Sequence, residues 1–272
     1  MNRVSAIQMT STISVEENLA SAESLIKIAA DQGSKLVVLP EMFPILGADS
    51  VDKVNVSEKF GDGLIQNFLS QQASKNHLWI VGGTIPLKGN DPGKVKAACL
   101  IFDDKGNIAG RYDKMHLFDV VVSESESYQE SATTEPGNNV AIIDTPIGRV
   151  GLSVCYDIRF PELYRRLFNS GAEIFTIPAA FTVKTGQAHW EVLARSKAIE
   201  NFCYVIGACQ TGQHSNGRAT YGHSLIINPW GEVISSLPES TGVITAEIDL
   251  EQLKQIRKNM PVNTHQKIFS IN

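Results

Sequence analysis

A cysteine stands where one predicted strand turns toward a predicted helix. Cys155 follows a short run of branched and apolar residues, Val150, Leu152 and Val154, that indicates a buried strand. Pro161 suits the first position of the helix behind it. The cysteine should therefore lie at the carboxyl edge of a sheet, where open α/β sheets hold their sites and nearby backbone N–H groups favour thiolate over thiol. We interpret Cys155 as a nucleophile, with a small buried core residue as the alternative.

A cysteine nucleophile needs a base, an orienting group and a stabiliser for the oxyanion. None of the six histidines has a distinctive spacing to Cys155, and no compact Cys/His cluster indicates a metal site. A carboxylate base with a lysine is the other possibility. Glu41 comes directly after the buried run 35–39, where an unpaired carboxylate would be costly, and Lys114 lies between a predicted strand and a long loop. Each alone is typical of a surface ion, but together with Cys155 they form a candidate catalytic set.

Composition excludes several classes of function. The chain has 272 residues, of which 43% are hydrophobic and 19% charged, as in an ordinary soluble enzyme. Its net charge of −5 argues against a nucleic-acid partner. No apolar run reaches membrane-spanning length, and the N-terminus lacks an apolar signal region. The four cysteines do not form a disulfide framework, so we expect a reducing, cytoplasmic setting.

Two segments repeat one strand–helix–strand plan, which bears on the fold. Residues 33–43 align with residues 171–181 without a gap. Upstream, an Arg-Val pair precedes Met9 at the same separation as another precedes Cys155. In this register Met9 matches Cys155 and Glu41 matches Ala179, so one half would carry the nucleophile and the other half the acid. No linker divides the chain, and we expect one α/β domain over 1–272 with mixed sheets and outer helices.

Local patterns predict the other elements. Ser14 and Glu17 have the spacing of a capping box at the start of a helix that would end near Gly33. Apolar periodicity and turn residues predict helices over 64–73, 188–201 and 250–258, hairpins of 96–102 with 108–111 and of 220–228 with 232–236, and an irregular tail. The Ser- and Glu-rich stretch 119–136 is interpreted as a surface loop, or alternatively as a lid over a site.

Three motifs resemble those of the carbon–nitrogen hydrolase (nitrilase) superfamily, in the family's order. Segments 39–43, 112–117 and 154–162 are similar to its glutamate, lysine and cysteine motifs. The resemblance implies a Glu41–Lys114–Cys155 triad without metal or cofactor. It also implies a four-layer α-β-β-α sandwich with two pseudo-symmetric halves, as a homodimer or a higher homo-oligomer.

The resemblance also assigns roles to further residues. The family's additional catalytic glutamate matches Glu130 best, with Glu124 and Glu126 as nearby competitors, and the backbone N–H of Tyr156 would help Lys114 to stabilise the oxyanion. An anionic substrate needs cations or donors for its carboxylates, whereas Arg159 is expected to pair with a carboxylate near the cysteine turn. Candidate substrate-binding residues are Phe181, Lys184, His189, Arg195 and Arg218.

Within the superfamily, Tyr156-Asp157 after the cysteine resembles the amidase branch. Segments 188–193 and 221–224 are most similar to amidases of deaminated glutathione. The implied reaction cleaves a small linear ω-amide through a Cys155 thioester, first of all deaminated glutathione into 2-oxoglutarate and cysteinylglycine. Alternatives are an omega-amidase acting on 2-oxoglutaramate, another N-carbamoyl or aliphatic amidase and, more remotely, a non-catalytic dimeric binding scaffold.

Overall fold

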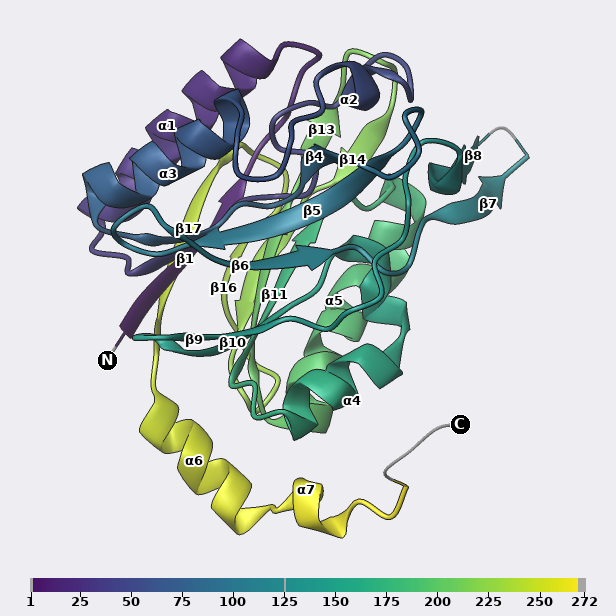
Figure 1. Ribbon diagram of the computed structural model, residues 1–272. Coiled ribbons are helices and arrows are strands. Elements are labelled where there is room, and N and C mark those ends of the chain that lie inside the picture. The colour runs from purple at the N-terminus through teal and green to yellow at the C-terminus, as the bar shows by residue number, and fades with distance from the viewer. Residues whose placement is uncertain (1, 125, 269–272) are drawn as a thin grey trace.

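Two sheets pack face to face in the computed structural model, which describes residues 2–124 and 126–268 (Figure 1). The first sheet has the strand order β17 (Gly242–Ile248), β1 (Asn2–Gln8), β2 (Leu36–Val38), β3 (Trp79–Val81), β5 (Val95–Phe102), β4 (Ile85–Lys88), and β6 (Ile108–Asp113) pairs with β5. The second has the order β16 (Val233–Leu237), β15 (Ser224–Ile227), β12 (Tyr204–Cys209), β11 (Ile174–Ala179), β10 (Gly148–Leu152), β9 (Ile142–Thr145). Both sheets mix parallel and antiparallel pairs, as expected.

Helices cover the outer face of each sheet. In Figure 1, α1 (Val15–Asp31) and α3 (Leu64–Asn76) lie outside the first sheet, whereas α4 (Pro161–Asn169) and α5 (Val183–Asn201) lie outside the second. Alternation along β1 explains this layering, because successive side chains of a strand point to opposite faces. Val4 and Ala6 join the apolar cluster that includes strands of both sheets, whereas Ile7 joins the cluster under α1 and α3. The predicted four-layer α-β-β-α sandwich is confirmed.

The two halves share hydrogen bonds as well as strand order. The backbone N–H of Lys35 donates to Arg3 O, and that of Glu173 donates to Arg149 O, each at 2.8 Å. Both arginines also donate from Nη1 to the carbonyl oxygen of the residue directly after the following helix, which is Gln32 or Ser170. Each half therefore starts with the same unit: a strand, a helix and a parallel neighbouring strand. The internal repeat inferred from sequence is present in the fold.

Several predicted elements lie close to their expected positions. The Ser14 hydroxyl accepts the N–H of Glu17 and caps α1. Helix α4 starts at Pro161, and β5 and β6 form the expected hairpin. Helices α3 and α6 (Leu250–Asn259) extend the predicted spans by one to three residues.

Other elements differ from expectation. Helix α5 begins at Val183 instead of residue 188, because the Thr182 hydroxyl caps it by accepting the N–H of Thr185. The strand expected over 220–228 is split into β14 (Ala219–Tyr221) and β15, since Gly222 and His223 have positive φ angles and turn the chain. Strand β14 pairs instead with β13 (Thr211–Gln213).

Two further segments are more ordered than predicted. The stretch 119–136 contains a hairpin of β7 (Asp119–Ser123) and β8 (Glu126–Gln129), followed by the 3₁₀ turn η1 (Glu130–Ala132). The expected irregular tail contains a short helix, α7 (Val262–His265). Over 2–124 and 126–268, no helix has the length and apolar character needed to cross a membrane.

Candidate active site

Glu41 is positioned by the chain immediately after β2. The residue is 4% exposed, so its carboxylate lies inside the protein. Its backbone carbonyl accepts a hydrogen bond of 3.1 Å from the Gln210 side chain, and the N–H of the next residue, Met42, donates to Thr84 Oγ1 at 2.8 Å. These bonds fix a turn in which Met42 has a φ of 55°. The predicted placement of Glu41 at a strand end is correct.

Lys114 follows β6 and reaches two carboxylates. Its Nζ lies 2.8 Å from Glu41 Oε1 and 2.8 Å from Glu130 Oε2, while the side chain is almost fully buried. The backbone is held on both sides, since the Lys114 N–H donates to Ala97 O and its carbonyl accepts the N–H of Gly137. Of the three predicted glutamates, Glu130 is therefore the one that contacts the lysine.

Cys155 occupies the first position of the 3₁₀ turn η2 (Cys155–Arg159), which begins three residues after the end of β10. Its φ of 46° lies in a region that residues with a Cβ seldom adopt, so the turn is strained. The N–H of Val154 is bound by the Asp157 carboxylate at 2.8 Å, which closes the turn from within. Such a tight bend presents the thiol to the space outside the carboxyl end of the sheet.

The ammonium of Lys114 stays protonated in this environment. Burial alone would lower the pKa of Lys114, but the carboxylates of Glu130 and Glu41 raise it well above its ordinary value. The converse holds for Glu130: burial would raise its pKa, whereas Lys114 and the Phe118 N–H, 2.7 Å away, lower it below the ordinary value. Lys114 and Glu130 therefore form a buried ion pair that also involves Glu41.

The thiol of Cys155 is protonated at rest, contrary to the thiolate expected from the turn alone. Burial raises the pKa of Cys155 well above its ordinary value, and the negative charge of Glu41 adds to the shift. The ammonium of Lys114 and the backbone N–H of Ala180 act in the opposite direction and are outweighed. The Glu41 side chain lines the same cavity as the thiol and can accept its proton.

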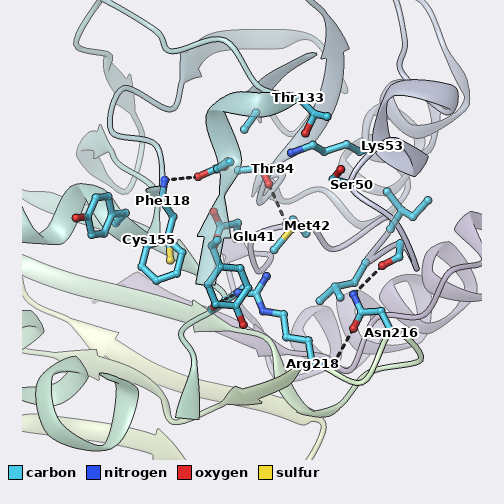
Figure 2. A pocket seen from close by; sticks show the side chains of 18 of the residues that line it. Glu41, Met42, Ser50, Lys53, Thr84, Phe118, Thr133, Cys155, Asn216 and Arg218 are labelled. Carbon is cyan, nitrogen blue, oxygen red and sulfur yellow. Dashed lines mark hydrogen bonds between the residues drawn. The ribbon is translucent and has the colours of Figure 1, made fainter. Parts of the chain in front are cut away.

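A cavity of about 500 Å³ opens over these groups. Its walls include Glu41, Lys114, Glu130 and Cys155, and they come from both halves of the chain. Figure 2 shows Glu41 and Cys155 close together in this cavity, with Arg218 approaching from the side of Asn216. The volume falls within the range typical of sites for small molecules.

Several residues predicted to bind substrate or stabilise the oxyanion do line the cavity. Tyr156 and Phe181 contribute aromatic walls. Arg218 donates to Ala180 O at 2.5 Å and lies 5.0 Å from the centre of the Tyr128 ring, while its Nε is buried without a hydrogen-bond partner among the described residues. Arg218 thus brings a positive charge to the cavity wall, and its Nε–H group is available to donate a hydrogen bond.

Three other predicted binding residues do not line the cavity. Arg195 lies on the outer side of α5, where its Nε donates to Gly231 O at 2.8 Å, so a role in substrate binding stays a prediction that this cavity does not support. Lys184 reaches away to Val122 O. His189 accepts a hydrogen bond of 3.1 Å at Nδ1 from Arg159 and so stands behind a residue of the wall.

Arg159 differs from its predicted structural role. Within the described residues it forms no ion pair with a carboxylate, although one was expected near the turn. Its guanidinium instead lies 5.9 Å from the centre of the Tyr156 ring and 5.8 Å from that of Phe181, at the cavity wall. A cation held by aromatic faces keeps its charge available to an anion in the cavity.

Sequence reasoning missed Lys53 and Thr133, which also line the cavity. Lys53 lies on the short helix α2 (Asp52–Asn55), and Thr133 follows η1. Figure 2 shows the two side chains next to each other and apart from Cys155. Neither belongs to a recognisable motif, so only the folded structure brings them to the site.

Across 2–124 and 126–268, no group of three or more His, Cys, Asp or Glu side chains is arranged to hold a metal ion. The cavity instead brings together a thiol, a carboxylate that can accept its proton and a lysine that keeps its charge. These are the requirements for attack on a carbonyl carbon with stabilisation of the resulting oxyanion.

Comparison with known proteins agrees with this chemistry. Residues 3–258 match the model of the carbon–nitrogen hydrolase family. The chain is 38% identical over 269 residues to the deaminated glutathione amidase of Yersinia enterocolitica, covering 98% of this chain and 93% of that protein. The yeast protein Nit3 from Saccharomyces cerevisiae, described as a member of branch 10 of the nitrilase superfamily, has a TM-score of 0.86 and 31% identity, covering 96% of this chain and 94% of that one. The NitFhit protein of C. elegans superposes with a TM-score of 0.91 at 36% identity over 98% of this chain, which spans 65% of that longer protein.

Proposed function

Because the chain belongs to the carbon–nitrogen hydrolase family and is a hydrolase of C–N bonds in amides, we propose that Glu41, Lys114 and Cys155 are its catalytic residues. The observation that carries this proposal is their convergence in one cavity, where Lys114 Nζ lies 2.8 Å from both Glu41 and Glu130. A protein that only binds ligands does not need a buried thiol in contact with a carboxylate.

In the first half of the reaction, Glu41 accepts the proton of the Cys155 thiol as the sulfur attacks the amide carbonyl carbon. A C–S bond forms, and the carbonyl electrons move onto oxygen. Two donors stabilise this oxyanion: the Lys114 ammonium and the backbone N–H of Tyr156. Tyr156 lies in the first turn of η2, where N–H groups lack partners within the helix. Glu41 then returns the proton to the nitrogen, the C–N bond breaks and the amine leaves.

In the second half, water replaces the amine. Glu41 takes a proton from the water as the water oxygen attacks the thioester carbon. The same two donors stabilise the second oxyanion. The C–S bond breaks, the carboxylic acid leaves, and the proton returns from Glu41 to the sulfur of Cys155. Glu130 holds Lys114 in place throughout.

Deaminated glutathione is the substrate that we propose first. It carries one carboxylate on the 2-oxo acyl group and one at the end of the leaving cysteinylglycine, so the reacting amide lies between two negative charges. The cavity offers cations from three separate elements, namely Lys53, Arg159 and Arg218, besides Lys114. The proposal assigns the acyl carboxylate to Arg159, four residues after the proposed nucleophile. Its guanidinium lies over the Phe181 ring and donates a hydrogen bond to His189.

The decisive experiment compares hydrolysis of deaminated glutathione and of 2-oxoglutaramate by release of 2-oxoglutarate, with Cys155→Ala as the control. We expect a higher kcat/KM for deaminated glutathione and no turnover by the variant. A preference for 2-oxoglutaramate would indicate an omega-amidase instead. Turnover by Cys155→Ala would contradict the proposed nucleophile.

The assembly and setting of the chain are part of the proposal. Residues 1–272 would form one domain, which the family match over 3–258 supports. Exposed apolar side chains on α5 and the nearby turn, Val192, Ile199 and Trp230, support a homodimer or a higher homo-oligomer through this face. Four free cysteines, one of them the nucleophile, suit a cytoplasmic location. Light scattering on the purified protein tests the oligomeric state.

A further inference from the structure

Lys53 brings a charge to the cavity that the proposed catalytic steps do not use. Its side chain lies partly buried on α2, and Nζ donates to Thr134 Oγ1 at 2.7 Å. No carboxylate among the described residues lies within ion-pair distance of this ammonium. Burial lowers the pKa of Lys53, with the carboxylate of Glu130 partly opposing the shift. An anion that entered the cavity would therefore find a poorly solvated cation with donors to spare.

Thr133 adds a second donor at the same wall. The residue is 6% exposed, and its Oγ1 is buried without a hydrogen-bond partner in the part of the chain that the structure describes. Buried hydroxyl groups are normally paired, and an unpaired one is costly. Figure 2 places this hydroxyl beside the Lys53 side chain. A carboxylate could accept hydrogen bonds from both.

The position of Lys53 relative to the proposed nucleophile indicates which end of a substrate it meets. The negative charge of Glu130 acts on the Lys53 ammonium. Glu130 contacts Lys114, and Lys114 in turn contacts Glu41. Because Glu41 gives its proton to the departing nitrogen in the mechanism above, the leaving group must lie on the Glu41 side. Arg159 comes instead from the cysteine turn itself.

We propose that Lys53 and Thr133 form a subsite for the terminal carboxylate of the leaving group. The ligand class is a short, peptide-like amine with a free C-terminus, which in deaminated glutathione is cysteinylglycine. This inference rests on the proposed function. It makes Lys53 and Thr133 determinants of specificity, since a substrate whose leaving group is only ammonia has nothing to place there.

The test uses a matched pair of substrates. Deaminated glutathione is compared with its analogue in which the C-terminal carboxylate is a carboxamide, so the reacting amide and the acyl group are identical. We expect the intact protein to favour the carboxylate by about tenfold or more in kcat/KM, because hydrogen bonds to a charged group are the strong ones. Lys53→Met should reduce this preference to about onefold to twofold, mainly through KM, and Lys53→Arg should restore part of it.

Two further variants separate a specific subsite from a general effect of charge. Thr133→Val removes only the hydroxyl and should lower the same preference by a smaller factor. Lys59→Met removes an exposed lysine of the same segment that does not line the cavity, and it should leave the preference as it was. If Lys53 merely balanced Glu130, Lys53→Met would slow both substrates equally and keep their ratio, which would overturn the subsite.

Different measurements reveal a failure of the subsite and a failure of the proposed function. An active wild-type protein whose preference for the carboxylate survives in Lys53→Met would overturn the subsite alone. Wild-type protein that hydrolyses neither member of the pair would overturn the proposed substrate, and the subsite with it. Thermal unfolding of each variant shows whether any loss reflects a damaged fold.

Discussion

The phenol of Tyr112, the next-to-last residue of β6, donates a hydrogen bond of 2.7 Å to Asp157, two residues after Cys155. Both side chains are almost fully buried, so this bond joins the strand that leads to Lys114 with the turn that holds the thiol. Asp157 also accepts the N–H groups of Val154 and His116, at 2.8 and 3.1 Å. The two sheets are thereby held together by a buried carboxylate next to the site.

Replacing Asp157 should destabilise the protein. In the wild type, the donors around Asp157 use both of its carboxylate oxygens. The Asp157→Asn side chain has only one acceptor oxygen, so at least one buried donor loses its partner. We expect the free energy of unfolding to fall by about 2–4 kcal/mol, measured by denaturant titration. Asp144→Asn, which breaks an exposed ion pair with Arg149, should change it by less than about 1 kcal/mol. Equal stability of the two variants would contradict this role of Asp157.

Removing the charge of Glu130 should impair catalysis more than removing that of a neighbour. Glu130→Gln takes away one of the two carboxylates that raise the pKa of Lys114 and hold its Nζ. We expect kcat to fall by about a hundredfold. Glu124→Gln, an exposed residue next to β7 in the hairpin that precedes Glu130, should retain wild-type activity. A larger fall in kcat for Glu124→Gln than for Glu130→Gln would show that Glu130 does not support Lys114 in catalysis.

The rate of Cys155 alkylation should rise with pH, and the rise should extend to unusually high pH values. Thiolate is the reactive form, and burial raises the pKa of Cys155 above its ordinary value, so the thiolate fraction at neutral pH is smaller than in a free cysteine. With iodoacetamide we expect the rate to keep rising past about pH 8.5, the ordinary pKa of cysteine. Cys155→Ala corrects for the other three cysteines, which are buried. A plateau near pH 6 or 7 would instead show a resting thiolate.

Gly83 should tolerate no side chain. Its φ is +56°, and a Cβ there would lie 2.0 Å from the carbonyl oxygen of Pro40, the residue before Glu41. Gly83→Ala should cost about 2 kcal/mol or more of stability and should lower kcat by displacing Glu41. Gly93→Ala, at an exposed turn with an ordinary φ, should stay within about 0.5 kcal/mol of the wild type. An unaffected kcat in Gly83→Ala would show that Glu41 is positioned independently.

The sequence predicted the features that local chemistry determines. Glu41, Lys114 and Cys155 each follow a strand within three residues, and strand ends can be recognised from apolar runs and turn residues. The repeat was visible because the two halves keep the same residues where their helices end, Gly33 and Gly171, both with positive φ. The cap at Ser14 depends on only four consecutive residues.

What the sequence could not predict depends on tertiary contacts. Lys53 lies on a helix of four residues, too short for any periodicity, and its partner Thr134 is far away in the chain. Arg159 lies among aromatic rings from two different elements, so a carboxylate partner was the simpler expectation. The protonated state of Cys155 depends on the depth of its burial and on Glu41, neither of which can be inferred from the turn itself.

The internal repeat has a consequence for the number of reaction centres. A chain built from two equivalent units could in principle hold two equivalent sites, one at each strand edge. Here the position related to Cys155 is Met9, and the position related to Glu41 is Ala179, and both are buried apolar residues. The first half supplies Glu41 and Lys114 and the second half supplies Cys155, whereas Met9 and Ala179 are part of the core. In the proposed mechanism, the duplicated architecture therefore has one asymmetric centre to which both halves contribute.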